Sequence, residues 1–323
     1  MKEKMLVALD GGIESLVTAW LLKKQGFQLR AVLFDVSEMN ESEENNQKMV
    51  SELEKKLGIP IQLVVAGVEA RELVAKEIKF EESRGFRYDV KSIFHQKFLF
   101  PKLFMLKEQL KFQKIATGHR VSLSYEPLED KMKVLRYSSF EQDEAHLLVG
   151  LEQEELRTLM FPLGSIPIPM IHKLASELEL KTNFKPSKFD VEFNPDLANT
   201  TSNDEVLKLD LAEKFDQSII FVNNQNQEVS SGLSDRVNRE VWLENASWFS
   251  GEDLGFKMKS CMMYWKEADQ PVSVRLSQYE GGGIKALLDE TGSGEISNLA
   301  NGDEVIWIEG DTVLGGARVV KCL

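Results

Sequence analysis

The sequence predicts an α/β domain built on a parallel sheet, followed by a small middle module and a C-terminal antiparallel β-barrel. Strand-like and helix-like segments alternate over the first 120 residues, which is typical of a parallel sheet with helices on both faces. Pro, Asn, Thr and Ser interrupt this alternation at 183–206. Short strands separated by Gly-containing turns after about residue 256 are typical of a small barrel. We therefore expect three units, at 1–185, 186–254 and 255–323.

The expected elements follow from the spacing of apolar residues. The apolar run at 5–9 predicts a strand, and helical spacing over 15–25 predicts a helix that Gly26 ends. The first unit continues with a strand at 29–34, a charged helix at 42–57, a strand at 61–65, a helix at 95–111 and a strand at 115–117. Barrel strands are expected at 272–276, 284–288, 305–308 and 313–320.

Composition narrows the class of protein. The chain has 323 residues and a net charge of −13, which argues against indiscriminate binding to nucleic-acid phosphates. It has no apolar run long enough to cross a bilayer and no evident signal peptide, so we expect a cytoplasmic protein without membrane contact. Its two cysteines, Cys261 and Cys322, make neither a disulfide framework nor a metal-binding spacing, and no metal site is predicted.

A Gly-Gly turn lies between the first strand and the first helix, and residues 10–15 are here called the Gly-Gly loop. Two glycines let the backbone turn sharply and approach a ligand closely. The helix that follows directs unpaired N–H groups at an anion. The loop lacks the Gly-Lys-Ser/Thr of a Walker A motif and the third glycine of a dinucleotide fingerprint. A phosphate site is predicted, and a βα turn without a ligand is the alternative.

Gly118 and His119 follow the strand at 115–117. Because ligands of parallel sheets lie beyond the carboxyl ends of the strands, we expect this corner to meet the Gly-Gly loop. His119 is either part of that site or a strand-end histidine held by the backbone. Four phenylalanines nearby favour a core face over a platform for stacking bases, because their spacing is helical: Phe94, Phe98, Phe100 and Phe104.

Positive charge is concentrated at 84–120, where nine Lys and Arg stand against Asp89 and Glu108. This segment carries +7 and leaves −20 for the rest of the chain. A local basic face on an acidic body is able to dock RNA. The alternative is a solvated helix face, since exposed lysines are common on helices.

Several motifs resemble those of one family. The Gly-Gly loop resembles the Ser-Gly-Gly-x-Asp-Ser loop of the PP-loop ATP pyrophosphatases, with Asp10 in place of Ser and Glu14 in place of Asp. Ala-Thr-Gly-His at 116–119 and Phe-Pro-Leu-Gly at 161–164 resemble segments of the tRNA-specific 2-thiouridylases. Further similar segments are Asp-Glu-Ala-His at 143–146, Asp-Gln-Pro at 269–271 and Leu-Gly-Gly-Ala at 314–317. The resemblance covers 1–185 and 255–323.

This resemblance implies a PP-loop fold and an ATP-dependent tRNA-modifying transferase, with Mg²⁺ and ATP as cofactors and tRNA and a sulfur-carrier or other protein as partners. It implies a nucleotide site formed by Asp10, Gly11, Gly12, Ile13, Glu14, Ser15, Phe34, Gly118 and His119. Together with the local charge, it suggests RNA contacts by Lys97, Lys102, Lys107, Arg120 and Lys266.

The family's sulfur chemistry meets a difficulty in this chain. In 2-thiouridylases one cysteine carries a persulfide and a second takes part in sulfur release, but the corresponding stretches, 86–96 and 187–193, contain no cysteine. Only a thiolate forms the persulfide and then the disulfide. We therefore expect a divergent member that does not thiolate by this route. The alternatives are a PP-loop adenylating enzyme with a non-sulfur nucleophile and a non-catalytic paralogue that binds tRNA or protein.

Overall fold

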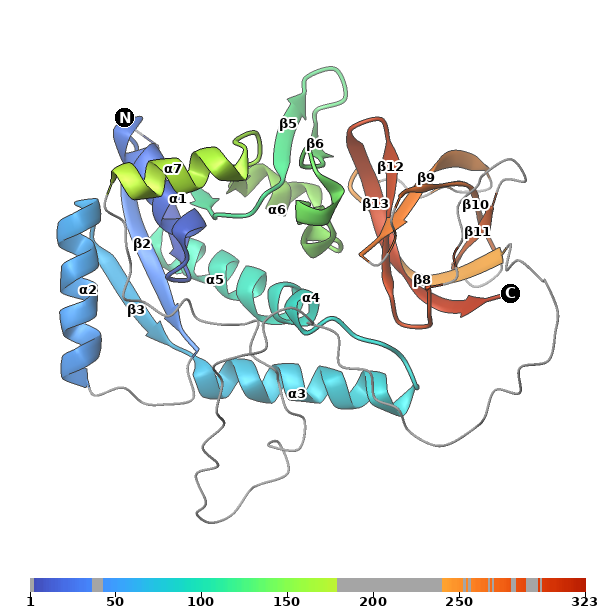
Figure 1. Ribbon diagram of the computed structural model, residues 1–323, viewed down its shortest axis with the longest axis horizontal. Coiled ribbons are helices and arrows are strands. Elements are labelled where there is room, and N and C mark those ends of the chain that lie inside the picture. Colours follow the sequence, from blue (N-terminus) through green and yellow to red (C-terminus); the bar gives the residue numbers. More distant parts are fainter. Residues whose placement is uncertain are drawn as a thin grey trace, which may run out of the picture.

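A computed structural model gives the fold. It describes residues 3–36, 43–178, 240–251, 257–266, 270–279, 283–288 and 298–323, with the single residues 254, 268 and 296. The first domain contains a parallel sheet of five strands in the order β3-β2-β1-β4-β7 (Figure 1). These strands are β1 (Lys4–Leu9), β2 (Gln28–Asp35), β3 (Ile61–Val65), β4 (Lys114–Ala116) and β7 (Leu159–Met160). The predicted α/β class is confirmed.

Side chains of the central strand alternate between two cores. Met5, Val7 and Leu9 of β1 face one core, and Leu6 and Ala8 face the other. The first core is completed by helices α1 (Ile13–Lys24), α2 (Glu43–Leu57) and α7 (Ile168–Glu177). The second core is completed by α3 (Gly67–Ser83), α5 (Phe100–Leu110) and α6 (Gln153–Thr158). Both faces of the sheet are therefore covered, as the alternation of strands and helices predicts.

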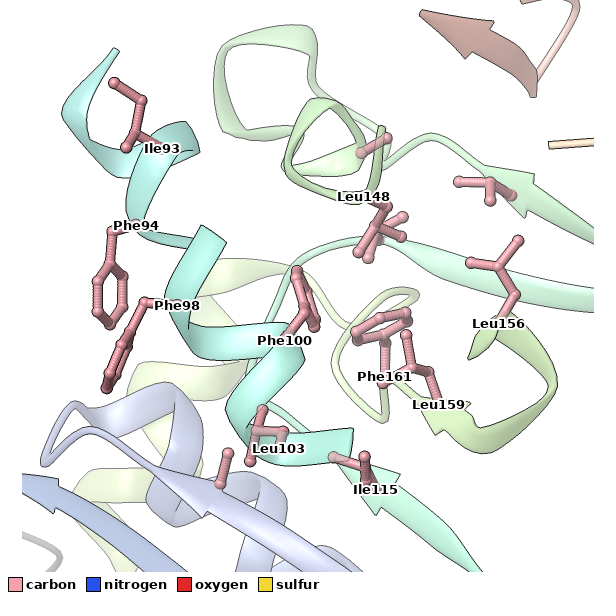
Figure 2. Packing of buried hydrophobic residues seen from close by; sticks show 14 of the residues in the cluster. Ile93, Phe94, Phe98, Phe100, Leu103, Ile115, Leu148, Leu156, Leu159 and Phe161 are labelled. Atoms are coloured by element: carbon pink, nitrogen blue, oxygen red, sulfur yellow. The ribbon is translucent and has the colours of Figure 1, made fainter. Parts of the chain in front are cut away.

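The helix predicted at 95–111 begins earlier and is not regular. It begins with α4 (Val90–Phe94), whose N-cap Asp89 accepts a hydrogen bond from the backbone N–H of Lys91. A π-helical turn, His95–Leu99, then leads into α5. Phe94 and Phe98 stack with ring centroids 5.2 Å apart, and Phe100 is fully buried (Figure 2). The phenylalanines therefore form a core face, as predicted.

Six strands close the C-terminal barrel in the order β12-β9-β10-β11-β8-β13, and β13 pairs again with β12. They are β8 (Glu240–Trp248), β9 (Lys259–Trp265), β10 (Val272–Gln278), β11 (Ile284–Leu288), β12 (Glu304–Glu309) and β13 (Thr312–Cys322). Strand β8 lies within the predicted middle module, 186–254, yet it pairs with β11 and β13. Most of that module lies outside the described residues, so the module stays a prediction.

The two domains are joined by a strand pairing that the sequence reading did not anticipate. The hairpin of β5 (Ser122–Glu126) and β6 (Lys131–Leu135) leaves the first domain and pairs with β13 through Leu135 and Thr312. Figure 1 shows this hairpin between the parallel sheet and the barrel. Two short 3₁₀ turns follow it, at Phe140–Gln142 and Ala145–Leu148. The barrel is thus held beside the carboxyl edge of the first domain.

Arginines reinforce this junction. Arg318 of β13 pairs with Glu81 of α3 at 2.7 Å and donates to the backbone carbonyl of Arg87 at 3.0 Å. Arg84 pairs with Glu244 of β8 at 2.5 Å.

Within the part of the chain that the structure describes, no helix is long and apolar enough to cross a lipid bilayer.

Candidate functional site

The Gly-Gly loop joins the carboxyl end of β1 to the N-terminus of α1. Gly11 has φ of 83°, a backbone conformation that favours glycine. Gly12 is the N-cap of α1 and no side chain caps the helix there. The predicted strand–turn–helix is therefore present at the edge of the sheet where ligands of parallel sheets lie.

A carboxylate of the chain itself accepts the donors at the start of this loop. Asp10 Oδ1 accepts from the Gly12 N–H at 2.8 Å and from the Ser15 hydroxyl at 2.5 Å. The same hydroxyl lies 3.0 Å from the Gly12 carbonyl. Donors of this kind are the ones that a phosphate would use. Asp10 therefore stands as an internal anion at the predicted phosphate site.

Gly118 brings the second predicted segment into contact with the first. A Cβ built on Gly118 would lie 2.8 Å from Ser15 N and 2.9 Å from the backbone carbon of Glu14. Real Cβ atoms do not approach backbone atoms this closely, so only glycine lets β4 end against the first turn of α1. The structure thus brings Gly118 to Glu14 and Ser15.

His119 is buried among aromatic rings. Its Nδ1 lies 2.6 Å from Thr117 Oγ1, and its ring stacks on Phe100 with centroids 5.6 Å apart. The ring of Phe161 approaches it edge-on, with centroids 6.0 Å apart, and Figure 2 labels Phe100 and Phe161, the two neighbours of His119 named here. Burial lowers the pKa of His119 below its ordinary value. His119 is therefore a neutral wall of the site at pH 7.

Arg120 connects the Gly-Gly loop to a buried acid. Its guanidinium lies 3.6 Å from Glu14 and 3.0 Å from Glu144. Glu144 also pairs with Lys91 at 2.6 Å. Burial alone would raise the pKa of Glu144, but the charges of Lys91 and Arg120 and the hydrogen bond from Lys91 outweigh it and hold that pKa far below its ordinary value. Glu144 is therefore ionised at neutral pH.

The remaining predicted nucleotide residue lies in the core. Phe34 ends β2 and is 4% exposed, with its ring centroid 6.2 Å from that of Phe98. Its side chain belongs to the hydrophobic core that also contains Phe98 and Phe100. The structure does not bring the Phe34 ring to the Gly-Gly loop, and a contact with a nucleotide base stays a prediction.

Four of the five predicted RNA-binding cations have partners within the chain. Lys102 pairs with Glu69 at 2.7 Å and Lys107 with Glu108 at 2.8 Å. Arg120 is bound as described, and Lys266 lies 3.8 Å from Asp89. Lys97, on the π-helical turn, is exposed. An RNA-binding role for these five residues stays a prediction.

Other motif residues fix the backbone around the site. A Cβ on Gly164 would collide with the carbonyl oxygen of Val121, which explains the glycine at the end of Phe-Pro-Leu-Gly. Asp143 is buried and accepts hydrogen bonds from the backbone N–H groups of Tyr137 and Ala145.

Glu144 and Lys91 were not among the predicted site residues, because 53 residues separate them in the sequence.

Both cysteines belong to the barrel. Cys261 is buried in β9 and burial raises its pKa to about 12. Cys322 lies at the end of β13, and burial raises its pKa too. Both are therefore thiols, not thiolates, at neutral pH. Among the described residues, no group of three or more His, Cys, Asp or Glu side chains is placed to hold a metal ion.

Comparison with known proteins identifies relatives of the first domain. A tRNA-specific 2-thiouridylase MnmA of Endomicrobium trichonymphae is 25% identical over 202 residues, which are 58% of this chain and 56% of the relative. That of Serratia proteamaculans is 29% identical over 188 residues, which are 56% and 50%. The chain thus spans about half the length of the curated relatives it matches. A predicted subunit of tRNA methyltransferase from Methanocaldococcus jannaschii aligns at a TM-score of 0.34 and 17% identity, over 54% of this chain and 75% of that one.

The sequence pattern of one family covers most of the first domain. The family described as the tRNA methyl transferase HUP domain matches residues 3–195, well over half of the chain. That match includes the Gly-Gly loop, the Gly118 corner and the segment containing Glu144. The chain therefore belongs to the tRNA methyl transferase HUP-domain family, the family of the tRNA-specific 2-thiouridylases.

Proposed function

We propose that the protein is an ATP-dependent tRNA-modifying protein of the 2-thiouridylase kind that does not thiolate by the cysteine persulfide route. The observation that carries the proposal is the contact of Gly118 with the Glu14–Ser15 backbone. It puts a glycine-rich turn, a helix N-terminus and His119 at one sheet edge, which is where doubly wound proteins bind nucleotides.

The residues fit a nucleotide only with help from a cation. Backbone N–H groups at the start of α1 would hold its phosphates. Asp10 already accepts two of the local donors, and two unit charges about 4 Å apart repel by about 4 kcal/mol at an effective dielectric near 20. Mg²⁺ binds through one or two carboxylates together with phosphate oxygens. Asp10 and Glu14 would supply those carboxylates.

When bound, ATP supplies an adenylyl group that activates a carbonyl oxygen of the RNA. The residues of the chain itself would orient the nucleotide phosphates and shield them from water. Neutral His119, packed between Phe100 and Phe161, excludes water from the edge of the loop. Arg120 is the cation nearest to Glu14 among the ion pairs of the described residues, and it would face the phosphates.

The sulfur step is the part that this chain does not supply. Cys261 and Cys322 are its two cysteines, and both lie in barrel strands as buried or half-buried thiols. A persulfide requires a thiolate that can reach the activated base. An amine would complete the modification without a cysteine, because it would form a bond to the activated carbon and release AMP, whereas water would only regenerate the original carbonyl.

A second candidate function is a non-catalytic paralogue that binds tRNA or a partner protein. The internal anion favours it, because Asp10 satisfies donors that a working phosphate loop would leave for its ligand. The RNA would lie over the face that carries Lys97 and Arg120 in either case. The two functions differ in whether ATP is consumed.

One assay separates them. The protein is incubated with α-labelled ATP, Mg²⁺ and an unmodified tRNA transcript, and pyrophosphate release and AMP are measured. Turnover that depends on tRNA supports the enzyme, and tRNA binding without turnover supports the paralogue. Adding a cysteine desulfurase should give no 2-thiouridine. Thiolation that a Cys261→Ser/Cys322→Ser variant retains would require a cysteine-free sulfur donor, and thiolation that this variant loses would make one of the two thiols the carrier.

A further inference from the structure

One buried carboxylate holds two cations beside the Gly-Gly loop. Glu144 lies on the segment between the two 3₁₀ turns, and its side chain is 9% exposed. One oxygen contacts Lys91 Nζ at 2.6 Å and Arg120 at 3.0 Å. The other accepts the backbone N–H of Arg120 at 2.8 Å. The acid therefore has charged or N–H partners on both oxygens.

The cations reach solvent while the acid does not. The side chains of Lys91 and Arg120 are 32% and 20% exposed, against 9% for Glu144. Arg120 Nε donates to the Gln142 carbonyl at 3.0 Å, and its other end faces Glu14. Each donor edge of the guanidinium thus points at an acceptor of the chain itself.

We propose that Glu144 is an internal substitute for an RNA phosphate, which neutralises Lys91 and Arg120 at the edge of the Gly-Gly loop and so determines how tightly this face binds RNA. The proposal rests on the proposed tRNA-directed function and names the residue that sets its affinity.

The physical basis is that the Glu144 carboxylate and an RNA phosphate compete for the same two cations. A carboxylate and a phosphate make the same charge-assisted hydrogen bonds to Lys and Arg. A phosphate that replaces Glu144 must break pairs that are shielded from water, and it must leave a buried carboxylate without a partner. In the parent protein these two cations therefore add little to RNA affinity, although they lie within the +7 segment.

The direct test compares Glu144→Gln with Glu141→Gln. Glu141 lies three residues away and is exposed, so both variants lose the same charge from the same segment. Binding of an unmodified tRNA transcript is measured between 50 and 200 mM salt. Each released cation that meets a phosphate steepens the double-log salt slope by about 0.7–0.9. Two released cations should make Glu144→Gln gain about tenfold more affinity at 50 mM than at 200 mM, relative to Glu141→Gln.

A third variant assigns the gain to the cations. Adding Lys91→Gln and Arg120→Gln to Glu144→Gln should return the salt slope to that of the parent. Thermal melting of each variant establishes that it is folded. Should Glu144→Gln fail to fold, Lys91→Gln alone carries the test, and it should bind tRNA as the parent does, because its charge is already neutralised.

Equal slopes for Glu144→Gln and Glu141→Gln would overturn the proposal, as would a flattened slope for Lys91→Gln. Binding of tRNA and ATP by the parent protein distinguishes failure of the Glu144 proposal from failure of the proposed function. A parent that binds tRNA and ATP while Glu144→Gln gains nothing refutes the role of Glu144 alone. A parent and a Glu144→Gln variant that both fail to bind tRNA refute the role of Glu144 and the tRNA-directed function together.

Discussion

The Ser15 hydroxyl donates to Asp10 Oδ1 at 2.5 Å, and the Gly12 N–H donates to the same oxygen at 2.8 Å. The Gly-Gly loop is thus closed by its own first residue. In the resemblance pattern a serine stands at position 10, and a serine brings no charge to the loop. Asp10 puts an anion into a turn that otherwise attracts anions, so we expect Asp10 to control nucleotide affinity.

Asp10→Asn should bind ATP·Mg²⁺ differently from the parent. The amide keeps an oxygen for Ser15 and Gly12 but removes the charge. Without Mg²⁺, removing the repulsion should raise the affinity for ATP by up to about three decades, the equivalent of about 4 kcal/mol. With Mg²⁺ between Asp10 and the phosphates, the same change should lower it. Calorimetry with and without Mg²⁺ measures both, and an equal gain in the two conditions would contradict a role for Asp10 as a ligand of the cation.

Gly118→Ala should destabilise the first domain by about 1–3 kcal/mol, because its Cβ would press on the Glu14 and Ser15 backbone, which cannot move freely. Gly12→Ala is the matched control. Its φ is −73°, and its Cβ would meet only the Asp10 side chain, at 3.1 Å. Urea unfolding gives both values. If the two variants were equally stable, the close approach of β4 to α1 would be wrong.

Glu304→Gln should stabilise the protein at pH 8 and have little effect at pH 5. Glu304 of β12 accepts from Gln96 at 3.3 Å, its buried Oε2 has no hydrogen-bond partner among the residues that the structure describes, and burial raises its pKa to about 7. An acid with a raised pKa binds its proton in the folded state where the unfolded chain has lost it, so stability falls as pH rises from about 4.5 to 7.

The neutral amide removes that loss. Melting temperatures of the parent, Glu304→Gln and Glu309→Gln at both pH values measure the effect, since Glu309 is exposed at the end of the same strand. Equal shifts for the two variants at pH 8 would contradict the assignment to the buried carboxyl.

Arg318→Met should destabilise the junction of the two domains by about 3–5 kcal/mol. Its loss leaves Glu81, whose side chain is 5% exposed, without its cation. Arg318→Met/Glu81→Met should recover most of that free energy, because an apolar pair replaces the ion pair without leaving a buried charge. Chemical denaturation of the three proteins tests this. A double variant no more stable than the single one would show that the loss comes from packing.

The sequence indicated those elements whose signal is local. The strand expected at 61–65 and the barrel strand expected at 284–288 have those bounds in the structure. The start of α4 was missed although Asp89 is an ordinary N-cap residue. The hairpin of β5 and β6 was missed because its partner, β13, lies about 180 residues further along the chain. Pairing over such distances leaves no local pattern.

The site residues also divide into those that have a local signal in the sequence and those that do not. Glycines at 11 and 118 are visible in the sequence because the backbone requires them. The ion pairs of Glu144 are not, because each of its cations comes from a different segment. Alternation along β2 would have put Leu33 and Phe34 on opposite, equally covered faces. Phe34 was expected at the ligand; its ring packs against Phe98 in the core, and a contact with the nucleotide stays a prediction.

The proposed ATP-dependent function requires that the Gly-Gly loop binds a nucleotide. Calorimetric titration of ATP·Mg²⁺ into the parent and into Gly12→Val tests it directly. A valine at position 12 puts a branched side chain against the Asp10 carboxylate, where the Gly12 Cβ position is already 3.1 Å from Oδ1. We expect measurable binding of ATP·Mg²⁺ by the parent and no binding by Gly12→Val, although the Gly12→Val protein stays folded. Equal affinity in the two proteins would place the nucleotide elsewhere, and no binding by the parent at any Mg²⁺ concentration would contradict the ATP-dependent function.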